Sequence, residues 1–363
     1  MNLTPDCPVK PLPFDEIFEK IETKAILKKL AIAHRSLAEL KGVVQSIPNQ
    51  TILINTLSLQ EAKHSSEIEN IITTQDELYQ ADLSEFSTFN PAVKEVQRYS
   101  YALNSGFNLI KQEQIIRLNT LLMVQEQLEH NNAGLRAISG TALKNAYTGK
   151  TVYTPPQHKN DIILLMENLI EFINTEDRFE LDPLTKMAII HHQFESIHPF
   201  YDGNGRTGRI LNILYLVKEN LLDIPILYLS RYLIENKSTY YTLLQAVRDS
   251  QNWEDWVQYI LNAIIETAQS TIELVKQIKI LMQNFKNQFR SELPKIYSQD
   301  LLNQLFMHPY SKIAFIQNHL GVSDKTAKRY LDELCRIGLL KKEKIGRENF
   351  YINYALFDLF IKY

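Results

Sequence analysis

The chain has 363 residues, 45 % of them hydrophobic and 22 % charged, and its 39 lysines and arginines nearly balance 42 aspartates and glutamates. The net charge of −3 provides no overall attraction to nucleic acid or to an anionic membrane, and no apolar run is long enough to cross a bilayer. Cys7 and Cys335 lie far apart in sequence, which indicates a reducing compartment rather than a disulfide framework. The N-terminus lacks the basic start and apolar run of a signal peptide, so we expect a cytoplasmic protein.

Glycine is sparse and apolar residues recur mostly with helical spacing, so the sequence predicts a mainly α fold. The length suggests two or three domains, which we place at residues 1–90, 91–290 and 291–363. The first opens with a proline-rich arm and continues into helical segments, such as residues 24–42, ended by Gly42 and Pro48. Spacing alone makes residues 63–70, KHSSEIEN, part of a solvated helix.

Residues 134–157 contain two β-prone runs around a turn at residues 148–150, and Pro155 and Pro156 end the second run. This pattern predicts a β-hairpin, which on a helical domain leaves an unpaired edge. From the residues alone, the hairpin is a covering flap.

Residues 182–197 predict a helix with Asp182 as its N-cap and Pro183 at its first position. His191 and His192 are adjacent on it and point about a hundred degrees apart, so they do not readily share a metal ion. Core packing or polar support of the following loop fits them better. The expected inward residues are Leu184, Met187, Ala188, Phe194 and Ile197.

That helix leads into residues 198–209, HPFYDGNGRTGR, whose composition indicates phosphate chemistry. Pro199 disfavours helical geometry at His198, so the histidine should lie on a non-helical corner facing a ligand. An imidazole that titrates near neutrality can accept a proton from an attacking hydroxyl. Asp202 supplies the hard oxygen ligand that Mg²⁺ prefers when substrate phosphates also hold the ion.

The second half of this segment has the features of an anion site. Gly203 and Gly205 let the backbone approach an anion closely, and a helix is expected to start just after them, with N–H groups that bind phosphate oxygens. Arg206 and Arg209 are three residues apart, so both can point toward one polyphosphate. Neither a Walker A loop nor an HExxH zinc motif occurs. The apolar residues that predict the helix are Ile210, Ile213, Leu214 and Val217.

Residues 198–209 resemble the Fic family signature, HxFx(D/E)GNGRxxR, at every fixed position. The resemblance implies transfer of AMP from ATP to a hydroxyl side chain of a protein, with His198 as general base and Asp202 as the Mg²⁺ ligand. Related Doc-type kinases carry a lysine at the position of Gly205, so the glycine favours adenylyl transfer. The resemblance assigns phosphate or ATP contacts to Gly203, Asn204, Gly205, Arg206, Thr207, Gly208 and Arg209, the arginines holding the β- and γ-phosphates.

The same resemblance gives residues 65–70 a meaning that their spacing does not. Fic proteins with an N-terminal inhibitory helix carry the pattern (S/T)xxxE(G/N), which Ser65, Glu69 and Asn70 fit. By this likeness, Glu69 pairs with Arg209 and takes the place of the γ-phosphate. Breaking a buried charge pair from one side costs roughly 3–5 kcal/mol, enough to hold an enzyme mostly off.

Two further site features follow from the family likeness. The edge of the 134–157 flap would pair with the backbone of a target segment and present its hydroxyl to His198, a form of β-augmentation. Tyr240 and Tyr241 resemble the family positions near the adenine, although core packing explains a tyrosine pair almost as well.

A long amphipathic pattern over residues 254–290, closed by Pro294, precedes a C-terminal region with helix-turn-helix spacing. Gly321 marks the turn, Ser323 the N-cap of the second helix, and Gly346 the tip of a two-stranded wing, which predicts a winged helix. This region has eleven lysines and arginines against eight acids, a modest surplus for DNA binding, so DNA and protein partners both stay open. Ala327, Tyr330, Leu331 and Leu334 are expected inward, and Lys325, Lys328 and Arg329 could face phosphates.

Together these features predict a Fic-type helical core with a β-hairpin flap, an N-terminal helical domain and a C-terminal winged helix. The expected function is an autoinhibited, self-modifying protein adenylyltransferase that acts on Ser, Thr or Tyr with ATP and Mg²⁺. One alternative is a winged-helix DNA-binding regulator that senses a nucleotide, although an intact His198 argues against it. Another is removal of AMP, with Glu69 positioning a water. The target is not specified by the sequence, and a homodimer is compatible with it.

Overall fold

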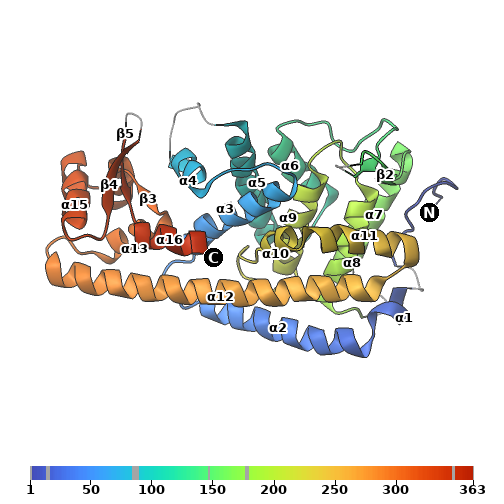
Figure 1. Ribbon diagram of the computed structural model, residues 1–363, viewed down its shortest axis with the longest axis horizontal. Coiled ribbons are helices and arrows are strands. Elements are labelled where there is room, and N and C mark those ends of the chain that lie inside the picture. The colour runs from blue at the N-terminus through green and yellow to red at the C-terminus, as the bar shows by residue number, and fades with distance from the viewer. Residues whose placement is uncertain are drawn as a thin grey trace.

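The computed structural model describes residues 2–13, 17–83, 90–145, 148–175, 180–345 and 348–362. It is mainly helical and elongated (Figure 1). Its helices are α1 (Phe18–Ile21), α2 (Lys24–Val44), α3 (Thr51–Ile68), α4 (Gln75–Leu83), α5 (Pro91–Glu113), α6 (Leu118–Glu129), α7 (Lys159–Asn174), α8 (Pro183–Ile197), α9 (Asn204–Lys218), α10 (Leu229–Glu235), α11 (Lys237–Ser250), α12 (Trp253–Glu292), α13 (Gln299–Met307), α14 (Ile313–Leu320), α15 (Asp324–Arg336) and α16 (Tyr354–Lys362). Its strands are β1 (Leu143–Lys144), β2 (Thr151–Tyr153), β3 (Tyr310–Ser311), β4 (Lys341–Ile345) and β5 (Glu348–Ile352).

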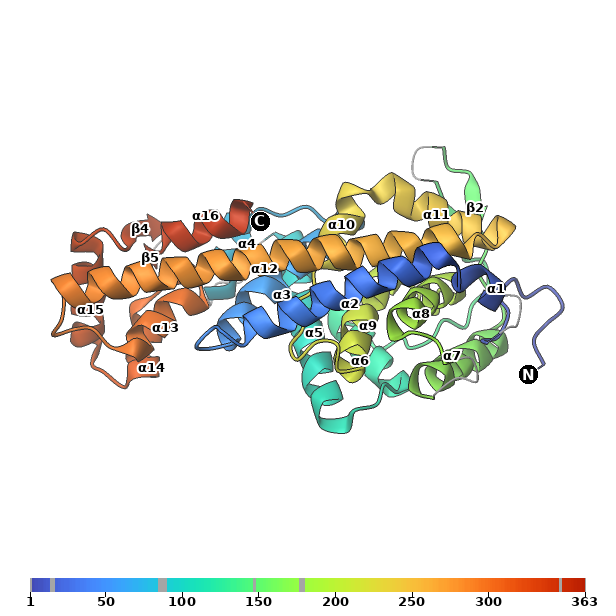
Figure 2. The ribbon, with the colours of Figure 1, turned by 90° about the horizontal axis from the view of Figure 1, so that it is seen from below.

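The 40-residue helix α12 runs along most of the molecule, and α2 packs beside it (Figure 2). Residues 254–290 thus form part of the single long helix that their amphipathic pattern predicts, which ends at Glu292 with Leu293 as its C-cap, just before Pro294. Helix α2 differs slightly from expectation, because it continues through Gly42 to Val44. A Cβ added to Gly42 would meet open space, so this glycine is simply tolerated within the helix.

Helices α5, α6, α8 and α9 form the packed centre around the signature segment. Every residue from Leu184 to Ile197 is buried, including all those expected inward, and the Asp182 side chain accepts a hydrogen bond from the Leu184 N–H as an N-cap. Helix α5 approaches α9 closely at Gly106, where a Cβ would lie 2.9 Å from Leu214. The centre therefore holds α8 and α9, which carry the signature residues, in fixed positions.

Helix α3 lies between this centre and the C-terminal region, and it contacts α5, α9, α10 and α13 (Figure 1). Most of its residues are buried, including Glu61, Ser65 and Ser66. The prediction that residues 63–70 form a solvated helix face, made from spacing alone, holds for the exposed Glu69 and Asn70 but is wrong for Ser65, Ser66 and Ile68, which are buried. The helix is enclosed on several sides, and Glu61 and Ser65 form hydrogen bonds to neighbouring helices.

The C-terminal region contains the predicted helix-turn-helix. Gly321 adopts a left-handed conformation after α14, and the Ser323 side chain caps α15 by accepting from the Thr326 N–H. Strands β3, β5 and β4 form an antiparallel sheet in that order, with Tyr310 opposite Ile352 and Lys342 opposite Tyr351. Gly346, the predicted wing tip, falls outside the described residues. Ala327, Leu331 and Leu334 are buried as expected, and Tyr330 is half-buried.

None of the helices in the described ranges is long and apolar enough to span a membrane.

Candidate active site

His198 ends helix α8 at a sharp corner. Its backbone is left-handed, with φ 49° and ψ 61°, and its N–H still donates to the Phe194 carbonyl at 3.0 Å. The predicted non-helical corner is thus confirmed, since Pro199 prevents α8 from continuing. The buried Nδ1 has no hydrogen-bond partner among the described residues, and only Nε2 is open to a ligand.

The corner is held from behind by Arg136, a buried residue that the sequence analysis did not single out. Its Nε donates to the His198 carbonyl at 2.7 Å, and its backbone N–H donates to the Pro199 carbonyl at 2.9 Å. Burial, together with the charges of Arg136 and Arg248, lowers the pKa of His198 from 6.5 to about 4. The imidazole is therefore neutral at physiological pH and can accept a proton.

The turn after His198 is fixed by Asn204. Its side-chain oxygen accepts from the Phe200 N–H and its amide donates to the Phe200 carbonyl, both at 2.8 Å. Gly203 is the N-cap of α9 in a left-handed conformation, φ 77°, which glycine adopts without strain. Helix α9 therefore begins at Asn204, and the expectation that it starts after Gly205 is wrong. Gly205 lies in its first turn.

Asp202 is exposed on this turn, and its Oδ1 accepts from the Gly203 N–H at 2.7 Å. Glu129 lies nearby: burial raises its pKa, and the charge of Asp202 raises it further, against the lowering effect of Arg206. No group of three or more His, Cys, Asp or Glu residues in the described part of the chain forms a metal-binding cluster. One exposed carboxylate fits a Mg²⁺ ion that is held mainly by substrate phosphates.

Arg206 is buried and makes two ion pairs. Its Nη2 lies 2.7 Å from Glu129 on α6 and its Nη1 lies 3.2 Å from Glu95 on α5. Both acids belong to helices that pack directly on α9. Sequence spacing gives no sign of these partners, because they precede Arg206 by 77 and 111 residues.

Arg209 is also buried, and its hydrogen bonds within the described residues all go to α3 or to the C-cap residue of α3. Its Nε donates to the Ser65 hydroxyl at 2.7 Å, and its Nη2 donates to the Ser65 carbonyl at 2.9 Å and to Glu69 at 2.8 Å. Burial alone would raise the pKa of Glu69, but the charge and hydrogen bond of Arg209 hold it below its usual value. Glu69 is therefore ionised at neutral pH, and it raises the pKa of Arg209 in turn.

Gly205 provides the space that this pair occupies. A Cβ at this position would overlap the Glu69 carboxylate and lie 2.9 Å from the Arg209 guanidinium. The Glu69 carboxylate thus lies next to the first turn of α9, where N–H groups and the helix dipole favour an anion. The structure therefore shows a carboxylate where the signature leads us to expect a phosphate.

Asn70 follows the pair without contacting Arg209. It has a left-handed backbone, φ 64°, and its side-chain oxygen accepts from Lys237 at 3.4 Å. Thr207 is buried, and its hydroxyl finds no hydrogen-bond partner in the described ranges. Gly208 packs against Glu195 and Phe194 of α8, so its role in the structure is close helix packing.

His191 and His192 are buried supports. His191 bonds to the Tyr240 hydroxyl at 2.9 Å and to Asn212 at 3.1 Å, while His192 lies 3.3 Å from the Leu244 carbonyl. Burial lowers both pKa values, that of His191 to about 3, so the rings are neutral. Of the two predicted roles, core packing is confirmed, since these contacts reach α9 and α11 and not the loop after α8.

The tyrosine pair divides into a buried and an exposed member. Tyr240 is packed against His191 and Trp256, whereas Tyr241 is 46 % exposed and meets the Tyr240 ring edge-on at 5.1 Å. Burial raises the pKa of both, and the charges of Arg209 and Glu69 act on both. The pair therefore adjoins Arg209, and Tyr241 is the member that a ligand can contact.

Glu195 is a buried acid beside Arg209 that the sequence analysis missed. Its side chain is 8 % exposed, and its Oε1 has no hydrogen-bond partner within the described residues. Burial raises its pKa to about 7, and Glu69 adds to that effect while Arg209 and Arg248 oppose it. Nothing in the sequence pattern distinguishes it from a surface glutamate on α8.

The predicted hairpin is present but short. Strands β1 and β2 pair antiparallel, with Leu143 opposite Tyr153, and Gly149 has φ 68° in the connection. The Tyr153 hydroxyl donates to the Ser196 carbonyl at 2.9 Å, which fixes β2 beside the corner at His198. The flap therefore lies over the signature site.

Sequence comparisons agree with this architecture. Models of the Fic/DOC family N-terminal region and of the Fic/DOC family match residues 27–108 and 109–216, and a model named protein adenylyltransferase SoFic-like, C-terminal domain, matches residues 281–356. The Drosophila grimshawi protein adenylyltransferase Fic is 29 % identical over 132 residues, 35 % of this chain and 26 % of that protein. The Caenorhabditis briggsae protein adenylyltransferase fic-1 is 28 % identical over 114 residues, 31 % and 20 % of the two chains. The alignments thus span about a quarter of these relatives.

Solved structures share the fold. A Fic family protein from Desulfovibrio desulfuricans has a TM-score of 0.58 at 18 % identity and covers 95 % of this chain and 98 % of its own. Fic-1 from C. elegans has a TM-score of 0.52 at 19 % identity, covering 69 % and 73 %. Since the two consecutive Fic/DOC models together match residues 27–216, more than half of the sequence, the chain belongs to the Fic/DOC family.

Proposed function

We propose that this protein transfers AMP from ATP to a hydroxyl side chain of a target protein, and that α3 keeps the transfer off through Glu69. The observation that carries the proposal is the enclosure of Arg209 by Ser65 and Glu69 beside a complete signature. The names of the D. grimshawi and C. briggsae relatives support adenylyl transfer as the reaction.

In the transfer, the acceptor hydroxyl oxygen bonds to the α-phosphorus while the bond to pyrophosphate breaks. His198 Nε2 takes the hydroxyl proton, since its neutral ring is open on that side. The N–H groups at the start of α9 and the Arg209 guanidinium bind phosphate oxygens and stabilise charge on the leaving pyrophosphate. Asp202 would hold Mg²⁺, which would neutralise phosphate charge when bound.

Glu69 competes with the γ-phosphate of ATP for Arg209. Its carboxylate takes the Nη2 of Arg209 and the space above Gly205, which a γ-phosphate would need. Glu69 is 36 % exposed, so withdrawal costs less than the roughly 3–5 kcal/mol expected for a fully buried pair. The contact is thus strong enough to hold the site closed and accessible enough to be released.

The direct test uses ATP labelled on the α- or the γ-phosphorus, with the full chain and a cell lysate. AMP transfer predicts label on protein from the α-labelled nucleotide only, and mass spectrometry of labelled bands identifies the target and whether the chain modifies itself. Label from the γ-position would instead indicate a kinase. Loss of AMP from a pre-modified target, dependent on Glu69, would favour the removal reaction.

A second function concerns the C-terminal region, where Lys325, Lys328 and Arg329 are all exposed on α15. If α15 binds duplex DNA, affinity must fall steeply with salt and weaken when these cations are replaced by alanine. Fluorescence anisotropy of a labelled duplex with the full chain tests this. Binding that is absent or insensitive to salt would leave the region as a protein-docking domain.

A further inference from the structure

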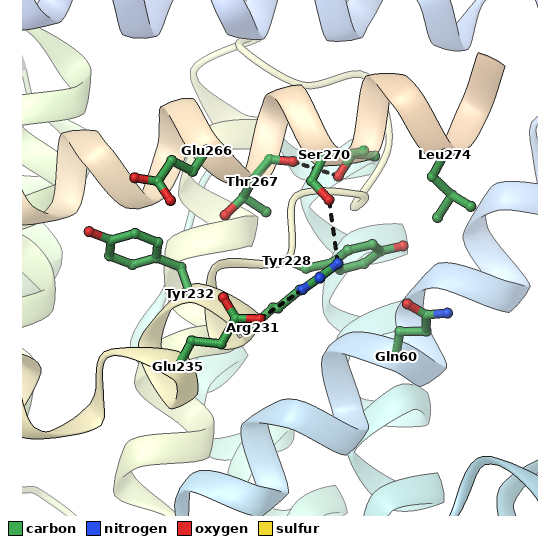
Figure 3. Close-up of a pocket in the computed structure, with 10 residues that line it drawn as sticks. Gln60, Tyr228, Arg231, Tyr232, Glu235, Glu266, Thr267, Ser270 and Leu274 are labelled. Atoms are coloured by element: carbon green, nitrogen blue, oxygen red, sulfur yellow. Dashed lines mark hydrogen bonds and ion pairs between the residues drawn. The ribbon is translucent and has the colours of Figure 1, made fainter. Parts of the chain in front are cut away.

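A cavity of about 200 Å³ lies outside the signature site, between α3, α10 and α12 (Figure 3). This is far more than the roughly 10–15 Å³ that one water molecule requires, so it admits a molecule of several non-hydrogen atoms. None of its lining residues was assigned above to the signature site. They are Gln60, Tyr228, Arg231, Tyr232, Glu235, Glu266, Thr267, Ser270, Thr271 and Leu274.

The cavity contains polar groups with unused hydrogen-bonding capacity. Tyr228 is 6 % exposed, yet its hydroxyl has no partner among the described residues. Arg231 donates its Nε to Glu235 at 3.2 Å and its Nη1 to Ser270 at 3.4 Å, while its Nη2 makes no hydrogen bond to the described residues. In Figure 3 the Arg231 guanidinium points toward Ser270, and Tyr228 lines the same cavity. A buried hydroxyl and a cation that line one cavity are suited to an anionic group.

The cavity also contains negative charge. Glu266 on α12 makes no ion pair within the described part of the chain, and it lies near Tyr232, whose pKa is raised first by burial and then by the Glu266 charge. A purely anionic ligand would be repelled by Glu266 and Glu235, and a purely cationic one by Arg231. A ligand that carries both charges satisfies both sides.

We propose that this cavity binds a small zwitterion of the amino-acid type. Its carboxylate would accept from Arg231 Nη2, the Tyr228 hydroxyl and the Ser270 hydroxyl, and its ammonium group would pair with Glu266. Leu274, Thr267 and Thr271 also line the cavity, and their size leaves room for a short side chain.

Occupancy would act on the contact between Glu69 and Arg209, a consequence that rests on the proposed function. Gln60 of the cavity wall is followed on α3 by Glu61, which accepts from the Ser230 N–H at 3.2 Å and so ties α3 to α10. Helix α3 ends just before Glu69. A ligand that binds this shape of the cavity more tightly than the shape with Glu69 withdrawn shifts the population toward the inhibited state.

The binding test uses the full chain and ligand-observed NMR with the neutral proteinogenic amino acids, followed by calorimetry for the best ligand. Butyrate and butylamine serve as singly charged comparisons. We expect at least one amino acid to bind, with affinity reduced tenfold or more by Arg231→Ala and by Glu266→Gln. Tyr228→Phe, which removes only a hydroxyl, should weaken binding without unfolding the chain. Glu273→Gln, an exposed glutamate on the same helix, is the matched control and should bind normally.

The proposal is overturned if no amino acid binds, if binding survives both charge variants, or if butyrate binds as tightly as the best amino acid. Because binding is measured without ATP, the test of this cavity is independent of the test of AMP transfer. A ligand that binds as expected while the Glu69→Gly chain shows no transfer activity would contradict the proposed function alone.

Discussion

Arg206 and Arg209 lie one turn apart on α9, and both are buried and paired with acids, yet their partners differ in origin. Arg206 is held by Glu95 and Glu129, which belong to helices packed on α9. Arg209 is held by Ser65 and Glu69, which belong to α3 and its end. The first arrangement is part of the core that supports the site, whereas the second depends on one helix of the N-terminal region keeping its place.

The difference shows that a signature arginine can be paired with acids of the supporting core, as Arg206 is, or with a carboxylate that competes with the nucleotide phosphate, as we propose for Arg209. Arg206 is paired with Glu95, which is 35 % exposed, and also with Glu129, which is only 12 % exposed. The one acid paired with Arg209 within the described residues, Glu69, is 36 % exposed, so the Arg209 pair is the easier of the two to open. The space above Gly205 makes the exchange of a carboxylate for a phosphate sterically simple. We therefore expect Arg206 to keep its ion pairs and Arg209 to exchange Glu69 for a phosphate.

The largest expected effect comes from removing the general base, His198, which does not depend on either arginine. His198→Ala in a Glu69→Gly background should lower AMP incorporation by roughly 10²-fold or more, the usual scale of losing a general base, while ATP binding stays intact. Because the pKa of His198 is lowered to about 4, the base stays deprotonated from neutral pH down to mildly acidic pH. The rate of the Glu69→Gly protein attributable to this group should therefore not decline near pH 6.5. A pH–rate profile that breaks at 6.5 would mean that His198 is solvated when substrate binds.

Arg209→Ala should give a smaller loss, about tenfold or more, and should remove the gain produced by Glu69→Gly. The reason is that Arg209 serves both the nucleotide and the inhibitory pair, so the two substitutions are strongly non-additive. Rates of α-labelled AMP incorporation by the single and double variants measure this. Additive effects of the two substitutions would show that Glu69 does not act through Arg209.

The smallest expected effect is a change in the free energy of unfolding when Glu195, the buried acid next to Arg209, is replaced. Its pKa is raised to about 7, chiefly by burial, so the folded state favours the protonated form. That contribution is fully present below the unfolded value near 4.5 and is lost as pH rises through about 7. Glu195→Gln should therefore gain about 1–3 kcal/mol over the parent between pH 5 and pH 8, as measured by denaturant unfolding at each pH. A difference that does not change with pH would place Glu195 in a more polar setting than the structure indicates.

Local signals in the sequence predicted the elements that bear the site. Pro199 fixes the corner at His198, Asp182 caps α8, and Ser323 caps α15, because each effect acts within a few residues. The start of α9 was misplaced because Gly203, in its left-handed conformation, already serves as the N-cap.

Long-range partners could not be predicted from spacing. Glu95, Glu129 and Arg136 meet the signature only after the helices pack, and nothing in their neighbourhoods distinguishes them from surface charges. The contact between Glu69 and Arg209 spans 140 residues, and the pattern at residues 65–70 indicated it only through the family resemblance. Periodicity alone placed the same residues on a solvated face, although Ser65, Ser66 and Ile68 are buried on α3.

The most direct test of the switchable arginine compares Glu69→Gly with Glu129→Gln at an ATP concentration well below saturation, with Mg²⁺, measuring the rate of AMP incorporation. The account predicts a gain of at least tenfold for Glu69→Gly, since about 1.4 kcal/mol of relieved competition already gives that factor, and no gain for Glu129→Gln. Equal rates for Glu69→Gly and the parent protein would contradict it.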